Sequence, residues 1–196
     1  MKFNALKIVS IFLLVSGSTL LIYSAYQLIS HNKKENIALA EAQSLVKEST
    51  DKSHLESPSF KYSFHTGDII GILEIPKLNK QLPVIEGTDE SELEKGVGHY
   101  STTKLPGQKD RIFLAGHRDT VFKKMGDLQI GDIILFQIDR TTHKYEIFET
   151  LIIDETDLSI LIPTNPEEIL TLSTCYPFEY LSSTEERYII NAKRIE

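Results

Sequence analysis

The chain has 196 residues, of which 41% are hydrophobic and 25% are charged, a balance that is sufficient for a packed core. Its formal net charge is −7, so it lacks the basic excess that nucleic-acid-binding domains use, and we exclude that class. A single cysteine cannot form an internal disulfide bond, so its free thiol needs an explanation of its own.

The first segment of note is an uncharged stretch at residues 8–30, IVSIFLLVSGSTLLIYSAYQLIS, which follows a short basic N-terminus at residues 1–7. About 20 apolar residues are needed to cross the hydrocarbon core of a bilayer, so residues 8–30 are predicted to be a transmembrane signal-anchor. A cleaved signal peptide is the alternative, but its apolar core would be shorter, about 7–15 residues. Lysines lie on both sides of the stretch, so charge gives only a weak preference for a cytoplasmic N-terminus.

A polar segment at residues 31–64 follows the apolar stretch. Its patch of Ala and Leu between residues 37 and 46 has too little apolar surface for a core. We interpret the segment as an extracytoplasmic stalk, helical in part, that lifts the following domain off the membrane. A disordered linker fits the composition equally well.

From residue 65 to residue 196 the pattern changes to short β-rich runs separated by Pro and Gly, which is typical of an all-β fold. Strands are predicted at 68–75, 81–87, 111–116, 132–139, 143–153, 169–175 and 187–195. A short helix is expected over 88–96 and a helical turn near 120–125. The pattern predicts a closed or half-closed β-barrel with few helices.

The lone cysteine, Cys175, ends the run TLSTC and is followed at position 177 by a proline, which cannot continue a central ladder. Free cysteine is often buried and inert. Here its neighbours Ser173 and Thr174 are polar, and a thiol at the rim of an extracellular domain is an oxidation liability. The position therefore favours a chemical role, with inert packing as the alternative.

A nucleophilic cysteine needs a base or a cation beside it. Four of the six histidines are expected at the surface: His31, His54, His65 and His143. His99 lies between glycines in GVGHY and stays open as a neighbour of a groove. His117 is the best placed, because it directly follows the hydrophobic strand RIFLAG at a rim. A purely structural histidine fits that position equally well.

The third component would be a cation that holds a substrate carbonyl or stabilises an oxyanion. If the strands on either side of the loop after Cys175 pair antiparallel, Cys175 and Arg187 become neighbours. Arg194 would lie at the opposite rim, and Arg118, beside His117, is interpreted as solvated. Topology therefore selects Arg187, with an ordinary surface arginine as the alternative.

Together these features resemble the sortases, membrane-anchored cysteine transpeptidases of Gram-positive bacteria, over roughly residues 65–196 and the N-terminal anchor. The resemblance rests on TLSTC, which matches the family's TLxTC, on LAGHRD and on RYII, all in the family's order. TCYPF, followed by a loop and ERYII, looks most like class D sortases. The resemblance implies an all-β, eight-stranded sortase-like barrel with a few short helices, preceded by the transmembrane helix.

The resemblance also implies a reaction and a role for each residue. Cys175 would be the nucleophile, His117 the acid and base, and Arg187 the group that positions the substrate or stabilises the oxyanion. Cys175 would attack the Thr carbonyl of an LPxTG-like signal, LPxTA or LPxTG, near the C-terminus of a secreted protein. An amine of a cell-wall precursor, of peptidoglycan or of a pilin would then resolve the thioacyl intermediate.

Further expectations follow from the same resemblance. A backbone amide near Thr174 would complete the oxyanion site, and Leu158, Ile160 and Leu161 would form an apolar wall for the Leu and Pro of the signal. No metal or cofactor is expected, because the loop 101–110 lacks the several carboxylates of calcium-stimulated class A sortases. No inhibitory lid is expected either, because Asp51 in the stalk has no aromatic partner beside it.

For localisation, the resemblance implies a single-pass protein of the cell membrane with a cytoplasmic N-terminus and an extracellular catalytic domain. Two alternative functions stay open. One is a membrane-tethered thiol hydrolase with the same three residues, and the other is a non-catalytic β-barrel binding module with an inert cysteine.

Overall fold

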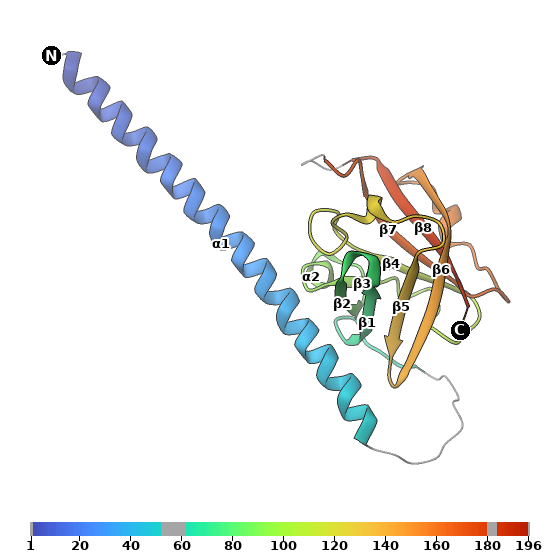
Figure 1. Ribbon diagram of the computed structural model, residues 1–196. Helices are drawn as coiled ribbons and strands as arrows, with labels where there is room; N and C mark the ends of the chain where they lie inside the picture. The colour runs from blue at the N-terminus through green and yellow to red at the C-terminus, as the bar shows by residue number, and fades with distance from the viewer. Residues whose placement is uncertain (1, 52–61, 180–183, 196) are drawn as a thin grey trace.

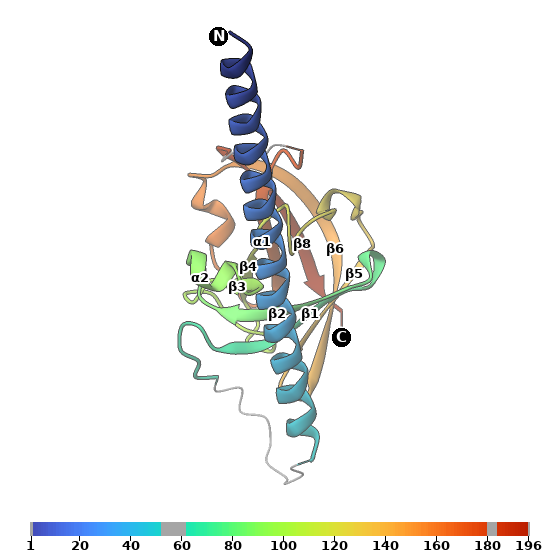
Figure 2. The same ribbon diagram turned by 90° about the vertical axis from the view of Figure 1, so that its left-hand side faces the viewer.

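The structure is a computed structural model, and it describes residues 2–51, 62–179 and 184–195. One long helix, α1 (Lys2–Asp51), runs past the side of a β-barrel formed by strands between residues 69 and 194 (Figures 1 and 2). Within the described part of the chain, α1 is the one helix that is long and apolar enough to cross a membrane.

The barrel has eight strands in the closed order β1-β2-β3-β4-β7-β8-β6-β5. Closure leaves no strand edge unpaired, which removes a common route to aggregation. The strands are β1 (Ile69–Ile75), β2 (Lys80–Glu86), β3 (Val97–His99), β4 (Arg111–Ala115), β5 (Ile133–Ile138), β6 (Thr141–Asp154), β7 (Ile169–Tyr176) and β8 (Glu186–Arg194). The short helices are η1 (Pro76–Leu78), α2 (Glu90–Leu93), η2 (Met125–Asp127) and η3 (Leu158–Leu161).

The barrel interior is filled by apolar side chains from alternate strand positions. In β5, for example, Ile134, Phe136 and Ile138 are fully buried, while the residues between them are partly exposed. This period of two is what a strand with one face on the core requires. The core therefore lies inside the barrel, and the rims are left for polar and reactive groups.

All seven predicted strands are present, with ends within two residues of the prediction. The sequence did not predict β3, because it has only three residues and contains Gly98. That glycine has a packing reason, since a Cβ there would lie 2.5 Å from the carbonyl oxygen of Gly87. The helix expected over 88–96 is the single turn α2.

The segment after the apolar stretch is helical as far as Asp51, whereas the sequence predicted helix in only part of it, and its role as a stalk stays a prediction. Residues 52–61 lie outside the described part of the chain. The structure adds a contact that composition did not indicate. Ala38 and Ala42 are buried, 5% and 1% exposed, where α1 meets β1 and β2.

Most neighbouring strands are antiparallel, but two pairs, β2 with β3 and β4 with β7, run parallel. β4 and β7 are the pair that bears on the site. Their C-terminal ends therefore lie at the same rim of the barrel. β8 returns antiparallel to β7, so it begins at that rim. We call this end of the barrel the β7 rim. In both views β8 starts at the end of the barrel that lies toward the N-terminal half of α1 and runs away to the C-terminus (Figures 1 and 2).

Candidate functional site

The pairing of β4 with β7 brings His117 and Cys175 to neighbouring positions. Ala115 pairs with Ser173 at the end of the ladder, and the amide of Gly116 donates to the carbonyl of Ser173 at 3.1 Å. His117 and Cys175 are each two residues beyond this last pair. Two segments that are 58 residues apart therefore end side by side at the β7 rim.

Arg187 lies on the other side of Cys175. The two residues are directly opposite in the antiparallel ladder of β7 and β8. Side chains of opposite residues lie on the same face of a sheet, with Cβ atoms about 5 Å apart. The register thus places Cys175 between His117 and Arg187, which is the grouping that the sequence predicted.

The three side chains are within reach of solvent. Residues Leu170–Thr174 of β7 are buried, and burial ends at Cys175, which is partly exposed. The side chains of His117 and Arg187 are 30% and 27% exposed. A thiol at position 175 can contact a molecule from solvent, whereas a thiol at any of the five preceding positions of β7 would be buried.

Packing beneath the rim fixes the backbone that carries His117. The buried hydroxyl of Thr174 donates to the carbonyl of Gly116 at 2.7 Å, and the amide of Phe122 donates to the carbonyl of His117 at 3.0 Å. A Cβ at Gly116 would lie 2.7 Å from Val121 and 2.8 Å from Phe122, so only glycine fits. The side chain of Thr174 therefore serves the fold, and a substrate contact at this residue would involve its backbone.

Two carboxylates approach the side chains of Arg187 and His117. Oε2 of Glu155 lies 2.5 Å from an Arg187 nitrogen, and Arg187 also donates to the carbonyls of Thr184 and Glu186 at 2.6 and 3.0 Å. Oε1 of Glu90, in α2, lies 3.5 Å from Nε2 of His117. The sequence did not predict either acid as a neighbour of the site. Glu155 lies in a loop and Glu90 in a single helical turn, and each is far in sequence from the residue that it contacts.

Aromatic rings anchor the start of the loop between β7 and β8. Tyr176 stands beside Tyr188 with ring centroids 6.2 Å apart, and Phe178 meets Tyr188 edge to face at 5.0 Å. Phe178 also packs against the core. Edge-to-face and offset-stacked pairs are favourable arrangements of aromatic rings, so the residues directly after Cys175 are held in place.

The apolar residues predicted to contact a substrate lie on the connection between β6 and β7. Leu158, Ile160 and Leu161 form η3, whose first turn is capped by Asp157 through the amide of Ser159 at 2.9 Å. Leu158 is 68% exposed. Since Asp154, the last residue of β6, pairs with the first residue of β8, this connection leaves the barrel at the β7 rim. Exposed leucine here has no packing role, which is compatible with the predicted apolar wall.

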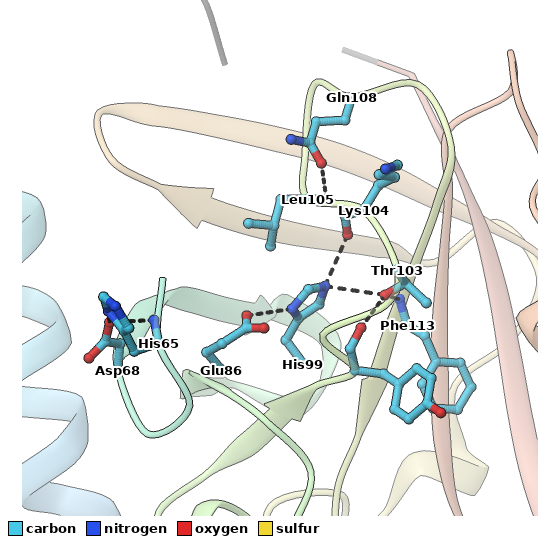
Figure 3. Close-up of polar contacts among 10 residues, drawn as sticks. His65, Asp68, Glu86, His99, Thr103, Lys104, Leu105, Gln108 and Phe113 are labelled. Carbon is cyan, nitrogen blue, oxygen red and sulfur yellow. Dashed lines mark hydrogen bonds and ion pairs between the residues drawn. The ribbon is translucent and has the colours of Figure 1, made fainter. Parts of the chain in front are cut away.

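His99 and His143 belong to the fold and not to the site. Nδ1 of His99 lies 2.6 Å from Oε2 of Glu86, and Nε2 faces the Lys104 carbonyl and the Thr103 hydroxyl (Figure 3). His143, expected at the surface, is fully buried, because β6 begins two residues before it and turns its side chain inward. Burial and the charge of Arg194 lower the pKa of His143.

The described residues contain no group of three or more His, Cys, Asp and Glu side chains that could hold a metal ion. Asp110, the carboxylate of the loop before β4, accepts instead from the amides of Arg111, Thr164 and Asn165 at 2.6 to 3.1 Å. Burial by itself would raise the pKa of Asp110, but these three bonds and the charge of Lys104 together outweigh burial and lower it. The same bonds tie two loops together.

Comparison with known proteins identifies the architecture. A family model described as the sortase domain matches residues 73–195. The chain is 40% identical to sortase D of Bacillus subtilis over 195 residues, which cover 96% of this chain and 98% of that protein.

Solved structures agree with this. A sortase D5 transpeptidase of Clostridium perfringens superimposes with a TM-score of 0.69 at 26% identity, covering 84% of this chain and 99% of that one. A sortase C of the same organism, with the C-terminal cell wall sorting motif, has a TM-score of 0.63 at 24% identity, covering 84% of this chain and 89% of that one.

Proposed function

The chain belongs to the sortase family, class D, and on that premise we propose that Cys175, His117 and Arg187 are the catalytic residues of a transpeptidase. The observation that carries the proposal is the strand register, which sets Cys175 between a histidine at the end of β4 and an arginine at the start of β8. A nucleophile, an acid–base group and a cation at one solvent-accessible rim are the groups that acyl transfer needs.

In the first half of the reaction, His117 takes the proton of the Cys175 thiol as the sulfur attacks the carbonyl carbon of the substrate Thr, and the carbonyl oxygen becomes negatively charged. Arg187 stabilises this oxyanion with its fixed positive charge. His117 gives a proton to the leaving amine, the peptide bond breaks, and a thioester on Cys175 remains.

In the second half, an incoming amine attacks the thioester carbonyl and His117 removes the proton that this amine loses. The carbon–sulfur bond breaks, the new amide leaves, and His117 passes its proton to the sulfur, which restores the thiol of Cys175. The thioester divides one difficult amide exchange into two easier steps.

The substrate class we propose is a secreted protein with an LPxTG-like signal, LPxTA or LPxTG, near its C-terminus. The sortase C of Clostridium perfringens was solved with the C-terminal cell wall sorting motif. In this chain, Leu158, Ile160 and Leu161 would contact the Leu and Pro of the signal, and the backbone at Thr174 would contribute to the oxyanion site. The acceptor would be an amine of a cell-wall precursor or of peptidoglycan.

We further propose a single-pass topology at the cell membrane. Residues 1–7 would be cytoplasmic, 8–30 would cross the membrane, 31–64 would form the stalk and 65–196 the extracellular catalytic domain. The uninterrupted α1, which carries the apolar stretch, supports this arrangement. A catalytic rim outside the cell is also where secreted proteins and cell-wall amines meet.

The test uses the full chain in detergent micelles with quenched LPNTA and LPQTG peptides and an amine acceptor. We expect the wild type to cleave the peptide and to show a thioester adduct on Cys175 in mass spectra. Cleavage and the adduct should both be lost in Cys175→Ala, His117→Ala and Arg187→Ala. A Cys175→Ala protein that still cleaves would refute the proposal. Cleavage without any amine-linked product would identify a thiol hydrolase.

A further inference from the structure

Arg118, the residue after His117, contacts both ends of the loop that joins β7 to β8. Its Nη1 donates to the carbonyl of Pro177 at 3.0 Å and lies 3.4 Å from the hydroxyl of Thr184. The residue is partly buried, so the expectation of a solvated surface arginine does not describe it.

These two contacts lie close to the reacting groups. Pro177 is two residues after Cys175, and Thr184 is three residues before Arg187. The carbonyl of Thr184 accepts from Arg187 at 2.6 Å, so Thr184 links one arginine to the other. One side chain therefore connects the strand end that carries His117 with both segments that flank the loop.

The closed barrel does not supply this connection by itself. The ladder of β7 and β8 ends where Tyr176 pairs with Glu186, and the ladder of β4 and β7 ends at Ala115 and Ser173. Beyond these pairs, the backbone of Gly116 still bonds Ser173 and Thr174, but no ladder pair reaches the described residues that flank the loop, 177–179 and 184–185. An arginine suits the task, because its guanidinium presents several N–H donors in a rigid plane and stays charged.

We propose that Arg118 is a positioning residue, which fixes the segments of Cys175 and Arg187 relative to His117 by bridging Pro177 and Thr184. The proposal rests on the function proposed above. Arg118 acts through Pro177 and Thr184 and is not assigned a contact with the substrate. Its loss should loosen the loop and reduce the fraction of time in which the three reacting groups are aligned.

The test compares Arg118→Gln, Arg118→Lys and wild type as full chains in detergent. Arg140→Gln is the matched control, since it removes the same charge from an exposed position at the turn between β5 and β6, at the far end of the barrel. We expect Arg118→Gln to lower kcat about three- to tenfold with little change in KM, and Arg118→Lys to recover part of the loss. Amide hydrogen exchange should become faster in peptides that contain the described ends of the loop, 176–179 and 184–187.

Coupling supplies a second criterion. If Arg118 acts through Thr184, the effect of Arg118→Gln on kcat should shrink in a Thr184→Val background, because the bridge is already weakened there. Full additivity would contradict a shared pathway.

Each other outcome overturns the proposal in a distinct way. Faster exchange with unchanged kcat would make the bridge a structural detail without a role in catalysis. Lower activity with unchanged exchange would mean that Arg118 acts on the substrate directly. If the wild type itself lacked transpeptidase activity, the proposed function would fail, while the exchange comparison would still decide whether the bridge holds the loop.

Discussion

At the scale of single residues, Arg187 and His117, the two groups beside Cys175, have carboxylate neighbours at different distances. Glu155 lies 2.5 Å from Arg187, and its own amide donates to the carbonyl of Glu185 at 2.6 Å. Glu90 lies 3.5 Å from His117 and its side chain is 75% exposed. A short, partly shielded pair is worth more than a long, solvated one, so Arg187 is the better-anchored group.

We therefore expect Glu155→Gln to reduce kcat/KM about two- to fivefold, because the amide keeps the shape of the side chain but loses the charge that holds the guanidinium. Steady-state kinetics with a sorting-signal peptide would measure the effect. Glu186→Gln is the matched control, since it removes the same charge from the residue next to Arg187. Glu186 accepts from the Arg187 guanidinium through its backbone carbonyl, which the substitution keeps. Equal rates in the two variants would show that Glu155 does not orient Arg187.

The positions of the proposed catalytic residues could be predicted from the sequence, whereas the residues that contact them could not. Cys175 and His117 follow hydrophobic strand runs, so strand ends alone place them at rims. Glu155 and Arg118 carry no local signal, because their contacts depend on how loops fold after the barrel has closed. For the same reason, the hydrogen bond from the Thr174 hydroxyl to the Gly116 carbonyl could not be predicted, although Thr174 lies within the TLSTC motif.

At the scale of elements, a buried hydrogen-bonded pair of side chains, Glu86 and His99, joins the ends of β2 and β3. Glu86 and His99 are register neighbours in this parallel pair, and both are almost completely buried. The pair lies beside the loop that leads to β4, where the other ring nitrogen of His99, Nε2, contacts the Thr103 hydroxyl and the Lys104 carbonyl (Figure 3). β3 is too short to be recognised by its hydrophobic pattern, and this polar contact is part of what holds it.

The pair gives the fold a dependence on pH. Burial by itself would raise the pKa of Glu86, but hydrogen bonds with His99 and Ser101 and the charge of His99 outweigh burial and lower it from its ordinary value of 4.5. A carboxyl group with a lowered pKa stabilises the folded state above its unfolded pKa, and this contribution is lost as the pH falls through the folded pKa.

We expect wild type to lose stability more steeply than Glu86→Gln as the pH falls from about 5 to 3, and the variant to be less stable by about 1–3 kcal/mol at pH 7. Urea denaturation at a series of pH values would give both quantities. Parallel curves for the two proteins would show that Glu86 does not contribute to the acid sensitivity of the fold.

The elements also mark the limit of prediction from sequence. Alternating hydrophobic runs identified seven of the eight strands, because each run is a local pattern. The strand order was not accessible in the same way. The pairing of β4 with β7 joins residues 58 positions apart, and its parallel direction follows from the path of the chain through β5 and β6.

At the scale of the whole molecule, α1 runs without a break from the apolar stretch to the residues that pack against the barrel. Lys34 forms an ion pair with Glu94, and Ala38 and Ala42 pack against the barrel where β1 and β2 face the helix. Ala38 is eight residues beyond position 30, which is about 12 Å along a helix at 1.5 Å per residue. A barrel docked there would lie close to the membrane surface, with its β7 rim toward the membrane (Figures 1 and 2).

Docking of α1 would matter for substrates that are themselves held in the membrane. Its effect can be separated from the catalytic step by comparing a membrane-anchored substrate with a soluble peptide. We expect Ala42→Arg to detach the helix, since a charge cannot be buried at a position that is 1% exposed. In vesicles containing the full chain, amides 34–46 should then exchange faster and cleavage of a membrane-anchored sorting-signal substrate should fall. Cleavage of a soluble peptide should stay unchanged.

Ser44→Arg is the matched control, because Ser44 lies on the same helix and is exposed. It should behave like wild type in all three measurements. If Ala42→Arg left amide exchange at 34–46 unchanged, the helix would not be docked in the membrane-bound protein. If exchange rose while both substrates were cleaved as before, the contact would exist without setting the height of the catalytic rim, and α1 would serve as an anchor alone.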